Sequence, residues 1–302
     1  MGTGRLAAHL AIMIERMSGL GAILTAMVTP FDAQLRVDEE RTVRLANHLV
    51  AHGSDGLVVC GTTGEAATLA DEEHLRVIEL VADELKGRAT VVAGVGSNDT
   101  RHAIELTEKA TALGADALLH VTPYYNRPNR RGIVAHFAAC ARATDKPIVL
   151  YNIPTRTGTD MPNDLLAELA QIDGIVAVKQ ANPDNLAMVD GLELYAGNDD
   201  MLADVLDLGG AGGICVASHV VGEQMRRMVD EPEKRREIDE QLQEVYAAMG
   251  VTTNPIPVKA ALNLLGHDVG GLRLPLVDAD EQETAVVRSA LERLGLLATA
   301  SA

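Results

Sequence analysis

Aromatic residues are scarce in this chain of 302 residues, which contains no tryptophan, two phenylalanines and five tyrosines. Because 47% of the residues are hydrophobic, the core of a folded domain must be built mainly from aliphatic side chains. The length is sufficient for one large α/β domain or two ordinary ones. Because tyrosine is rare in this chain, the position of each tyrosine is informative.

Basic charge is also in short supply, since the formal net charge is −17. This balance argues against binding to nucleic acid, whose phosphates require a basic surface, and against an anionic membrane surface. No apolar run approaches the length of a transmembrane helix. Residues 1–18 carry charges inside their apolar stretch, which is not the pattern of a secretory signal. We therefore expect an N-terminal tail over 1–18 and a cytoplasmic protein.

Disulfide and metal-binding patterns are missing as well. The three cysteines, Cys60, Cys140 and Cys215, are far apart and lie in apolar contexts, as small core residues do. The nine histidines show no HExxH, HxH or Cys/His spacing typical of a zinc site. The sequence predicts no disulfide framework, no metal site and no cofactor.

What the chain does contain is a regular alternation of short β-branched runs and amphipathic stretches. The expected strands are 22–28, 56–60, 90–94, 115–121, 147–151, 174–180, 192–196 and 212–217. A helical pattern follows each strand, and the weakest one is near 185–191. Eight strand–helix pairs are the count and size of a (β/α)8 TIM barrel, predicted here over 19–222. A doubly wound open sheet is the alternative, but no G-x-G-x-x-G follows the first strand.

Beyond the last expected strand the sequence reads as helical. Helices are expected over 231–249, 255–265 and 280–294, each followed by a glycine that can end it. No linker rich in proline, glycine or serine separates this part from the barrel. We expect a C-terminal helical region over 223–302 that packs on the barrel.

The sixth expected strand is apolar but ends in Lys179. Period-2 alternation places Lys179 on the same face as Ile175 and Ala177, with Gln180 on the opposite face. In a covered strand, desolvation favours the neutral amine, which is the nucleophile that forms Schiff bases with carbonyl substrates. The alternative is that the strand ends there and the lysine reaches water. The segment taken alone favours that alternative.

The residues at the ends of the other strands favour the catalytic interpretation of Lys179 instead. A barrel places its active site at the carboxyl ends of its strands. Three of the five tyrosines share this rim with Lys179, which the tendency of loops to be polar does not explain. The Gly61-Thr-Thr-Gly-Glu65 turn offers N–H groups and hydroxyls that suit a small carboxylate, although such turns also serve only to reverse the chain. Tyr151 is either an acid/base or a core tyrosine, and Arg156 is either a carboxylate ligand or a solvated loop residue.

These residues carry a resemblance to the dihydrodipicolinate synthase family of pyruvate-dependent class I aldolases and lyases. The likeness covers residues 21–297, nearly the whole chain. The segments that carry it are Gly61-Thr-Thr-Gly-Glu65, Val121-Thr-Pro-Tyr-Tyr-Asn-Arg-Pro128, Tyr151-Asn-Ile-Pro-Thr-Arg-Thr-Gly158, Val176-Ala-Val-Lys179 and Asn254-Pro-Ile-Pro-Val-Lys259.

The resemblance implies a carbon–oxygen lyase that condenses pyruvate with L-aspartate 4-semialdehyde in diaminopimelate and lysine biosynthesis. It implies that Lys179 forms the imine with pyruvate and that Tyr151 is the central acid/base. It also implies a homotetramer built as a dimer of dimers. The remaining implied roles are a proton relay through Thr63 to Tyr125, which reaches into a neighbouring subunit, pyruvate binding by Thr62 and Thr63, semialdehyde binding by Arg156, and lining of the site by Gly197 and Ile214.

Two departures from the family pattern leave specificity and regulation open. Gln180 stands where family members often have an acidic residue. Asp71 and His102 stand where lysine-inhibited members place histidine and glutamate, so the sequence does not predict feedback inhibition. One alternative function is another Schiff-base aldolase, such as an N-acetylneuraminate lyase or a keto-deoxy sugar acid aldolase. Another is a non-catalytic barrel that binds a small molecule.

Overall fold

A closed barrel of eight parallel strands forms the centre of the computed structural model, which describes residues 19–298. The expected tail over 1–18 lies outside the described residues. The strands follow chain order around the barrel, and β8 closes it by pairing with β1. Their bounds are β1 Ile23–Ala26, β2 Gly56–Val59, β3 Thr90–Gly94, β4 Ala117–Val121, β5 Ile148–Asn152, β6 Ile175–Gln180, β7 Glu193–Ala196 and β8 Gly212–Cys215.

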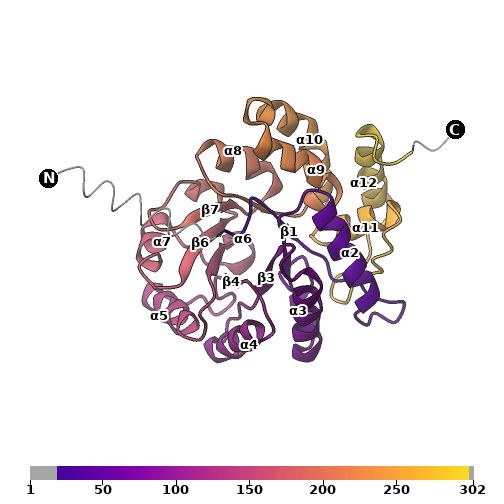
Figure 1. Ribbon diagram of the computed structural model, residues 1–302. Helices are drawn as coiled ribbons and strands as arrows, with labels where there is room; N and C mark the ends of the chain where they lie inside the picture. The colour runs from indigo at the N-terminus through magenta and orange to yellow at the C-terminus, as the bar shows by residue number, and fades with distance from the viewer. Residues whose placement is uncertain (1–18, 299–302) are drawn as a thin grey trace.

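Helices surround the strands (Figure 1), so the expected (β/α)8 barrel is confirmed. The helices up to β8 are α2 Glu39–Ala51, α3 Asp71–Leu85, α4 Thr100–Ala112, α5 Arg130–Ala141, α6 Pro154–Thr157, α7 Asn163–Leu169 and α8 Leu202–Asp207. The short 3-10 helices among them are η1 Ala66–Thr68, η2 Pro183–Asn185 and η3 Asp199–Met201.

Helix α2 illustrates how the sequence specifies these helices. The side chain of Asp38 accepts a hydrogen bond from the backbone N–H of Arg41, and Glu39 and Glu40 follow in the first turn. Acidic residues at this end stabilise the positive end of the helix dipole. Leu45 and Leu49, one turn apart, are buried against the barrel.

The helix expected near 185–191 is wrong. The chain instead forms η2, and Val189 pairs with Leu192 in an isolated antiparallel bridge. Pro183 begins η2, and the Asn182 side chain accepts a hydrogen bond from the Asp184 backbone N–H. A side chain that bonds the local backbone offers the chain an alternative to helix, which explains why the weak apolar pattern is not realised.

Two apolar layers follow from the alternation of side chains along the strands. The inner layer fills the barrel and includes Leu24, Val58, Leu119 and Val149. The outer layer packs the opposite faces of the strands against the surrounding helices. The barrel is therefore a packed core, and a cavity can open only at its rim.

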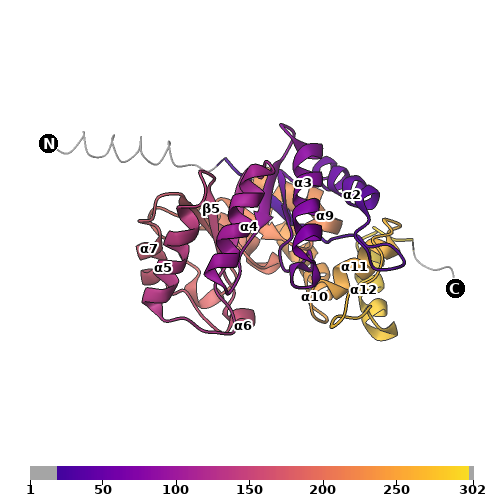
Figure 2. The same ribbon diagram turned by 90° about the horizontal axis from the view of Figure 1, so that it is seen from below.

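The C-terminal helices are also present, namely α9 Ser218–Asp230, η4 Pro232–Lys234, α10 Arg235–Met249, α11 Ile256–Leu264 and α12 Glu281–Arg293. Helix α6 directly follows β5 and so lies at the carboxyl end of that strand. In Figure 2, α6 and the helices α10 to α12 lie towards the same, lower edge of the molecule. The expected domain boundary after residue 222 falls inside α9, beside the non-helical backbone of Val221. Over residues 19–298, no helix is long and apolar enough to cross a membrane.

Candidate active site

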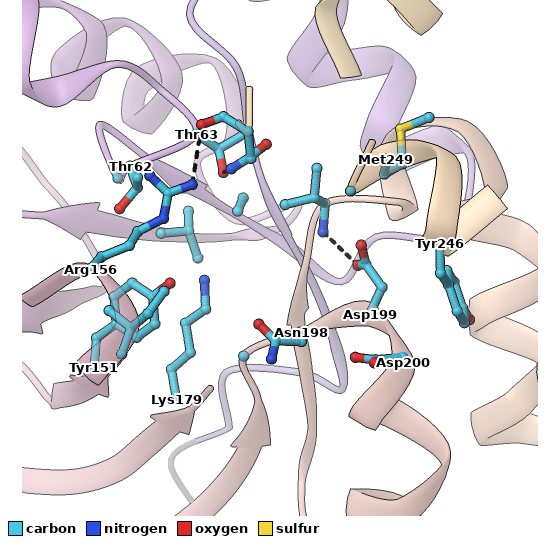
Figure 3. Close-up of a pocket in the computed structure, with 18 of the residues that line it drawn as sticks. Thr62, Thr63, Tyr151, Arg156, Lys179, Asn198, Asp199, Asp200, Tyr246 and Met249 are labelled. Atoms are coloured by element: carbon cyan, nitrogen blue, oxygen red, sulfur yellow. Dashed lines mark hydrogen bonds between the residues drawn. The ribbon is translucent and has the colours of Figure 1, made fainter. Parts of the chain in front are cut away.

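A cavity of about 430 Å³ opens at the carboxyl ends of the strands. Figure 3 shows that Lys179 and Tyr151 rise side by side into it, and that Arg156 extends over them from the side. The expected site residues that line this cavity are Thr62, Thr63, Tyr151, Arg156, Lys179 and Gly197. They lie at or soon after the carboxyl ends of four strands, β2, β5, β6 and β7, which the closed barrel brings together.

Lys179 is buried, with 5% of its surface exposed. The β5–β6 register places it opposite Tyr151, and its Nζ lies 4.2 Å from the centre of the Tyr151 ring. Within residues 19–298 the amine makes no hydrogen bond and no ion pair. A buried lysine amine that is committed to no carboxylate is available as a nucleophile.

The turn after β2 supplies two hydroxyls. Thr63 is buried, and its Oγ1 accepts a hydrogen bond from Nδ2 of Asn254 at 2.9 Å. The turn is fixed from below, because the hydroxyl of Thr29 donates to the carbonyl of Gly64 at 2.7 Å. A side chain at residue 64 would be crowded, since a Cβ there would meet the backbone of Cys60 and Met27 at 3.1 and 3.2 Å. The turn therefore presents its hydroxyls from a fixed backbone.

Arg156 lies exposed in α6 at the mouth of the cavity. Its Nη2 donates to the backbone carbonyl of Asn254 at 3.3 Å, as the dashed line in Figure 3 marks. Its guanidinium has no carboxylate partner among residues 19–298. The remaining N–H groups are therefore available to bind an anionic ligand.

Two expected residues stand apart from the cavity. Tyr125 is 90% exposed, has a positive φ of 70° and does not line the cavity. Ile214 is fully buried in β8 and belongs to the inner apolar layer. Gly197 does line the cavity, and a Cβ at its position would approach Ala181 within 2.7 Å. The relay from Thr63 to Tyr125 is not closed within the described part of one chain and stays a prediction.

The sequence did not single out the acidic side of the cavity, which Asp199 and Asp200 line. Oδ1 of Asp199 accepts hydrogen bonds from the backbone N–H groups of Val216 and Ala217 at 2.8 and 3.0 Å. Figure 3 marks one of these bonds with the dashed line at Asp199. Burial raises the pKa of Asp199, against the opposing effect of these two donors and of Lys179. Asp199 and Asp200 follow Gly197 and Asn198 just after β7, and this position at a strand end was the available signal.

Gln180 lies on the opposite face of β6 from the cavity and is fully buried. Its Oε1 accepts hydrogen bonds from Nδ2 of Asn152 at 3.1 Å and from the backbone N–H of Asn182 at 2.9 Å. These contacts connect the ends of β5 and β6. Gln180 therefore supports the strand that carries Lys179 without contacting the cavity.

Asp71 and His102 line an adjoining cavity of about 540 Å³. Nε2 of His102 lies 3.1 Å from Oδ1 of Asp71, and Nδ2 of Asn98 donates to the carbonyl of Tyr124. This cavity shares Thr62, Tyr151 and Arg156 with the first. The two residues that depart from the lysine-inhibited pattern thus face each other beside the candidate site.

Known proteins resemble this chain over nearly its whole length. The model of the Dihydrodipicolinate synthetase family matches residues 19–294. A 4-hydroxy-tetrahydrodipicolinate synthase of Heliobacterium modesticaldum is 46% identical over 288 residues, which cover 91% of this chain and 96% of that protein. A crystal structure of DHDPS from Cyanidioschyzon merolae with lysine bound has a TM-score of 0.89 and 41% identity, covering 92% of this chain and 99% of that one. A monomeric dihydrodipicolinate synthase variant has a TM-score of 0.89 and 36% identity, covering 92% and 98%.

Proposed function

The chain belongs to the dihydrodipicolinate synthetase family, and we propose that it is a 4-hydroxy-tetrahydrodipicolinate synthase, a lyase of diaminopimelate and lysine biosynthesis. In this reaction pyruvate condenses with L-aspartate 4-semialdehyde. The observation that carries the proposal is the amine of Lys179. Within residues 19–298 it makes no hydrogen bond or ion pair, and it is buried beside Tyr151 in a cavity at the barrel rim.

The chemistry starts at Lys179. Its amine adds to the ketone carbon of pyruvate, and loss of water gives an imine. Removal of a methyl proton converts the imine to an enamine, whose carbon attacks the aldehyde of the second substrate. The amino group of the bound semialdehyde then attacks the imine carbon, closes the ring and releases Lys179. Tyr151, whose ring lies beside the Lys179 amine, is placed to carry protons to and from these intermediates.

Two neighbouring groups are assigned to the carboxylates of the substrates. Thr62 and Thr63 hold the carboxylate of pyruvate through hydroxyl and backbone N–H groups. Arg156, at the mouth and without a carboxylate partner, binds the carboxylate of the semialdehyde. Gly197 lines the cavity at a position where a Cβ would clash with Ala181, and Ile214 belongs to the inner apolar layer of the barrel.

Initial-rate assays with matched substrates test this assignment. Condensation of pyruvate with L-aspartate 4-semialdehyde is expected to exceed cleavage of N-acetylneuraminate or of keto-deoxy sugar acids by at least about a hundredfold, which corresponds to about 3 kcal/mol of transition-state discrimination. Faster turnover of a sugar acid would assign the chain to the alternative aldolases. Absence of turnover with every substrate would favour a non-catalytic binding barrel.

Assembly into a homotetramer, a dimer of dimers, is part of the proposal. Its support is Tyr125, which is 90% exposed and outside the cavity of its own chain, as a residue that completes a neighbour's site must be. One related structure is of a monomeric variant, so the state of this chain needs its own measurement. Sedimentation velocity and initial rates are measured for the wild type and for Tyr125→Phe. The first measurement reports on assembly and the second on proton transfer.

Two further expectations belong here. We propose that the chain acts in the cytoplasm, which its three unpaired and buried cysteines support. We also propose that the chain divides into a barrel over 19–222 and a C-terminal helical region over 223–302. Its support is that α10 to α12 follow the last strand, and Asn254, just before α11, contributes to the cavity. Expression of residues 19–222 alone tests whether the barrel folds without the helices.

A further inference from the structure

Two histidines and a cysteine meet inside the protein, away from the candidate active site. His120 projects from the outer face of β4, and His136 and Cys140 lie one turn apart on α5. All three side chains are buried, and one nitrogen or sulfur atom of each lies within 4.8 Å of the others. The proposed reaction uses none of them.

The tautomer of His120 follows from its neighbour. The hydroxyl of Thr107 donates to the carbonyl of Ala103 at 2.6 Å, so its oxygen can only accept from Nε2 of His120 at 3.2 Å. The ring proton therefore sits on Nε2, and Nδ1 carries a lone pair. Nδ1 is fully buried and has no hydrogen-bond partner. A buried acceptor without a partner is unfavourable, and a bound metal ion or a water molecule would satisfy it.

The second imidazole, that of His136, also contacts a threonine hydroxyl. The hydroxyl of Thr100 lies 2.9 Å from Nδ1 of His136, and Nε2 of His136 lies 4.0 Å from Sγ of Cys140. A threonine hydroxyl of α4 thus lies within hydrogen-bond distance of one nitrogen of each ring, Nε2 of His120 and Nδ1 of His136. The other nitrogen of each ring faces away from that threonine. Hydrogen bonds of this kind orient histidines at metal centres.

Burial keeps both rings neutral, as metal ligands must be. It lowers the pKa of His120 to about 3 and that of His136 to about 4. The same burial raises the pKa of the Cys140 thiol to about 11, so the thiol loses its proton only when something replaces it. No carboxylate bonds to the three residues within 19–298.

Charge then selects the kind of ion. One thiolate and two neutral imidazoles carry a single negative charge, which a monovalent cation cancels and a divalent cation exceeds. An uncompensated charge in a fully buried site is strongly unfavourable. Soft thiolate and imidazole ligands suit Cu(I), and three ligands suffice for it.

We propose that His120, His136 and Cys140 form a three-coordinate site for a soft monovalent metal ion of the Cu(I) class. Nδ1 of His120, Nε2 of His136 and Sγ of Cys140 are the ligands. Binding exchanges the thiol proton for the ion and involves no change of oxidation state. The ligand atoms are farther apart than in a metal complex, so each side chain turns inward on binding. The sequence did not reveal the site because its third ligand comes from a different element.

Titration of the full chain with Ag(I), an air-stable probe of the same charge and softness, tests the site. Mass spectrometry under non-denaturing conditions is expected to show one ion per chain, with release of one proton and a rise in the melting temperature. Cys140→Ser and His120→Asn are expected to weaken binding at least tenfold. Cys60→Ser, which alters a buried cysteine elsewhere and keeps a donor to the His74 carbonyl, is the matched control.

Three results would overturn the proposal. They are absence of Ag(I) binding by the wild type, loss of binding in Cys60→Ser but not in Cys140→Ser, and Zn(II) binding as tight as that of Ag(I). The first needs no variant, so the test holds even if a substitution prevents folding. None of the measurements depends on catalysis, and failure here leaves the proposed synthase activity untouched.

Discussion

Nζ of Lys259 lies 2.7 Å from Oε1 of Glu65, and both side chains are 1% exposed. Lys259 belongs to α11, whereas Glu65 ends the Thr62–Thr63 turn and has a left-handed φ of 56°. The second oxygen of Glu65 accepts the backbone N–H of Arg273 at 3.0 Å. The C-terminal region is therefore attached to the turn that supplies the hydroxyls of the cavity.

Replacement of one partner leaves the other charge buried and unpaired. Lys259→Met is expected to lower the free energy of unfolding by about 3–5 kcal/mol and to raise the KM for pyruvate. Urea unfolding and initial rates measure the two effects. Lys109→Met, which changes an exposed lysine at the end of α4, should alter stability by no more than about 0.5 kcal/mol.

The double variant Glu65→Gln/Lys259→Met separates coupling from simple loss of packing. Because the two groups act as a pair, the double variant should be less destabilised than the sum of the single variants. Strict additivity of the two free-energy changes would show that the pair is not coupled. An unchanged KM for pyruvate in a folded Lys259→Met protein would show that the pair does not position the turn.

The Thr63 hydroxyl, which accepts from Asn254, is expected to matter for proton transfer. Thr63→Val keeps the shape of the side chain and should lower kcat about 10²–10⁴-fold, the usual contribution of a positioned proton donor or acceptor. Thr63→Ser keeps the hydroxyl and should stay within about tenfold of the wild type. Steady-state kinetics decide, and equal losses in the two variants would contradict a role for the hydroxyl.

Arg156 is expected to act on the second substrate only. Loss of its hydrogen bonds to a carboxylate corresponds to about 1.5–3 kcal/mol, so Arg156→Ala should reduce kcat/KM for the semialdehyde about 10- to 100-fold. Imine formation with pyruvate should be unaffected. Arg131→Ala, at another exposed arginine, is the control. Equal semialdehyde kinetics in Arg156→Ala and the wild type would refute the assignment.

His219 predicts acid sensitivity. Nδ1 donates to the Val216 carbonyl at 2.8 Å, and Nε2 accepts from the Val28 N–H at 3.2 Å, so protonation would break the second bond. Burial lowers the pKa of His219 to about 4. Because the unfolded chain binds the proton more tightly, up to about 3 kcal/mol of stability present above pH 6.5 is lost as the pH falls towards 4.

Urea unfolding at several pH values between 7 and 4 measures this loss. His219→Gln retains an acceptor for Val28 but cannot take up the proton, so the decline in its free energy of unfolding should be shallower. A wild type whose stability rises on acidification, or a variant with an equal slope, would contradict the account. The buried His120 and His136 contribute in the same direction, because burial lowers their pKa values as well.

Local patterns predicted most of the fold. Period-2 alternation predicted the strand that carries Lys179, and the count of strand–helix pairs predicted the barrel. The segment 185–191 was predicted wrongly, because side-chain bonds of Asn182 outweighed a weak apolar period. Asp199, the Glu65–Lys259 pair and the cluster around His120 escaped prediction for one physical reason. Each of them joins residues from different elements, and only the folded chain brings these residues into contact.

Borohydride reduction in the presence of pyruvate tests the central claim most directly, because it traps the imine as a stable secondary amine. Intact-protein mass spectrometry should show one pyruvate-derived adduct per chain, and peptide mapping should place it on Lys179. The adduct should be absent in Lys179→Ala and present in Lys146→Ala. An unmodified wild-type chain, or an adduct on another lysine, would contradict the assignment of Lys179 as the covalent centre.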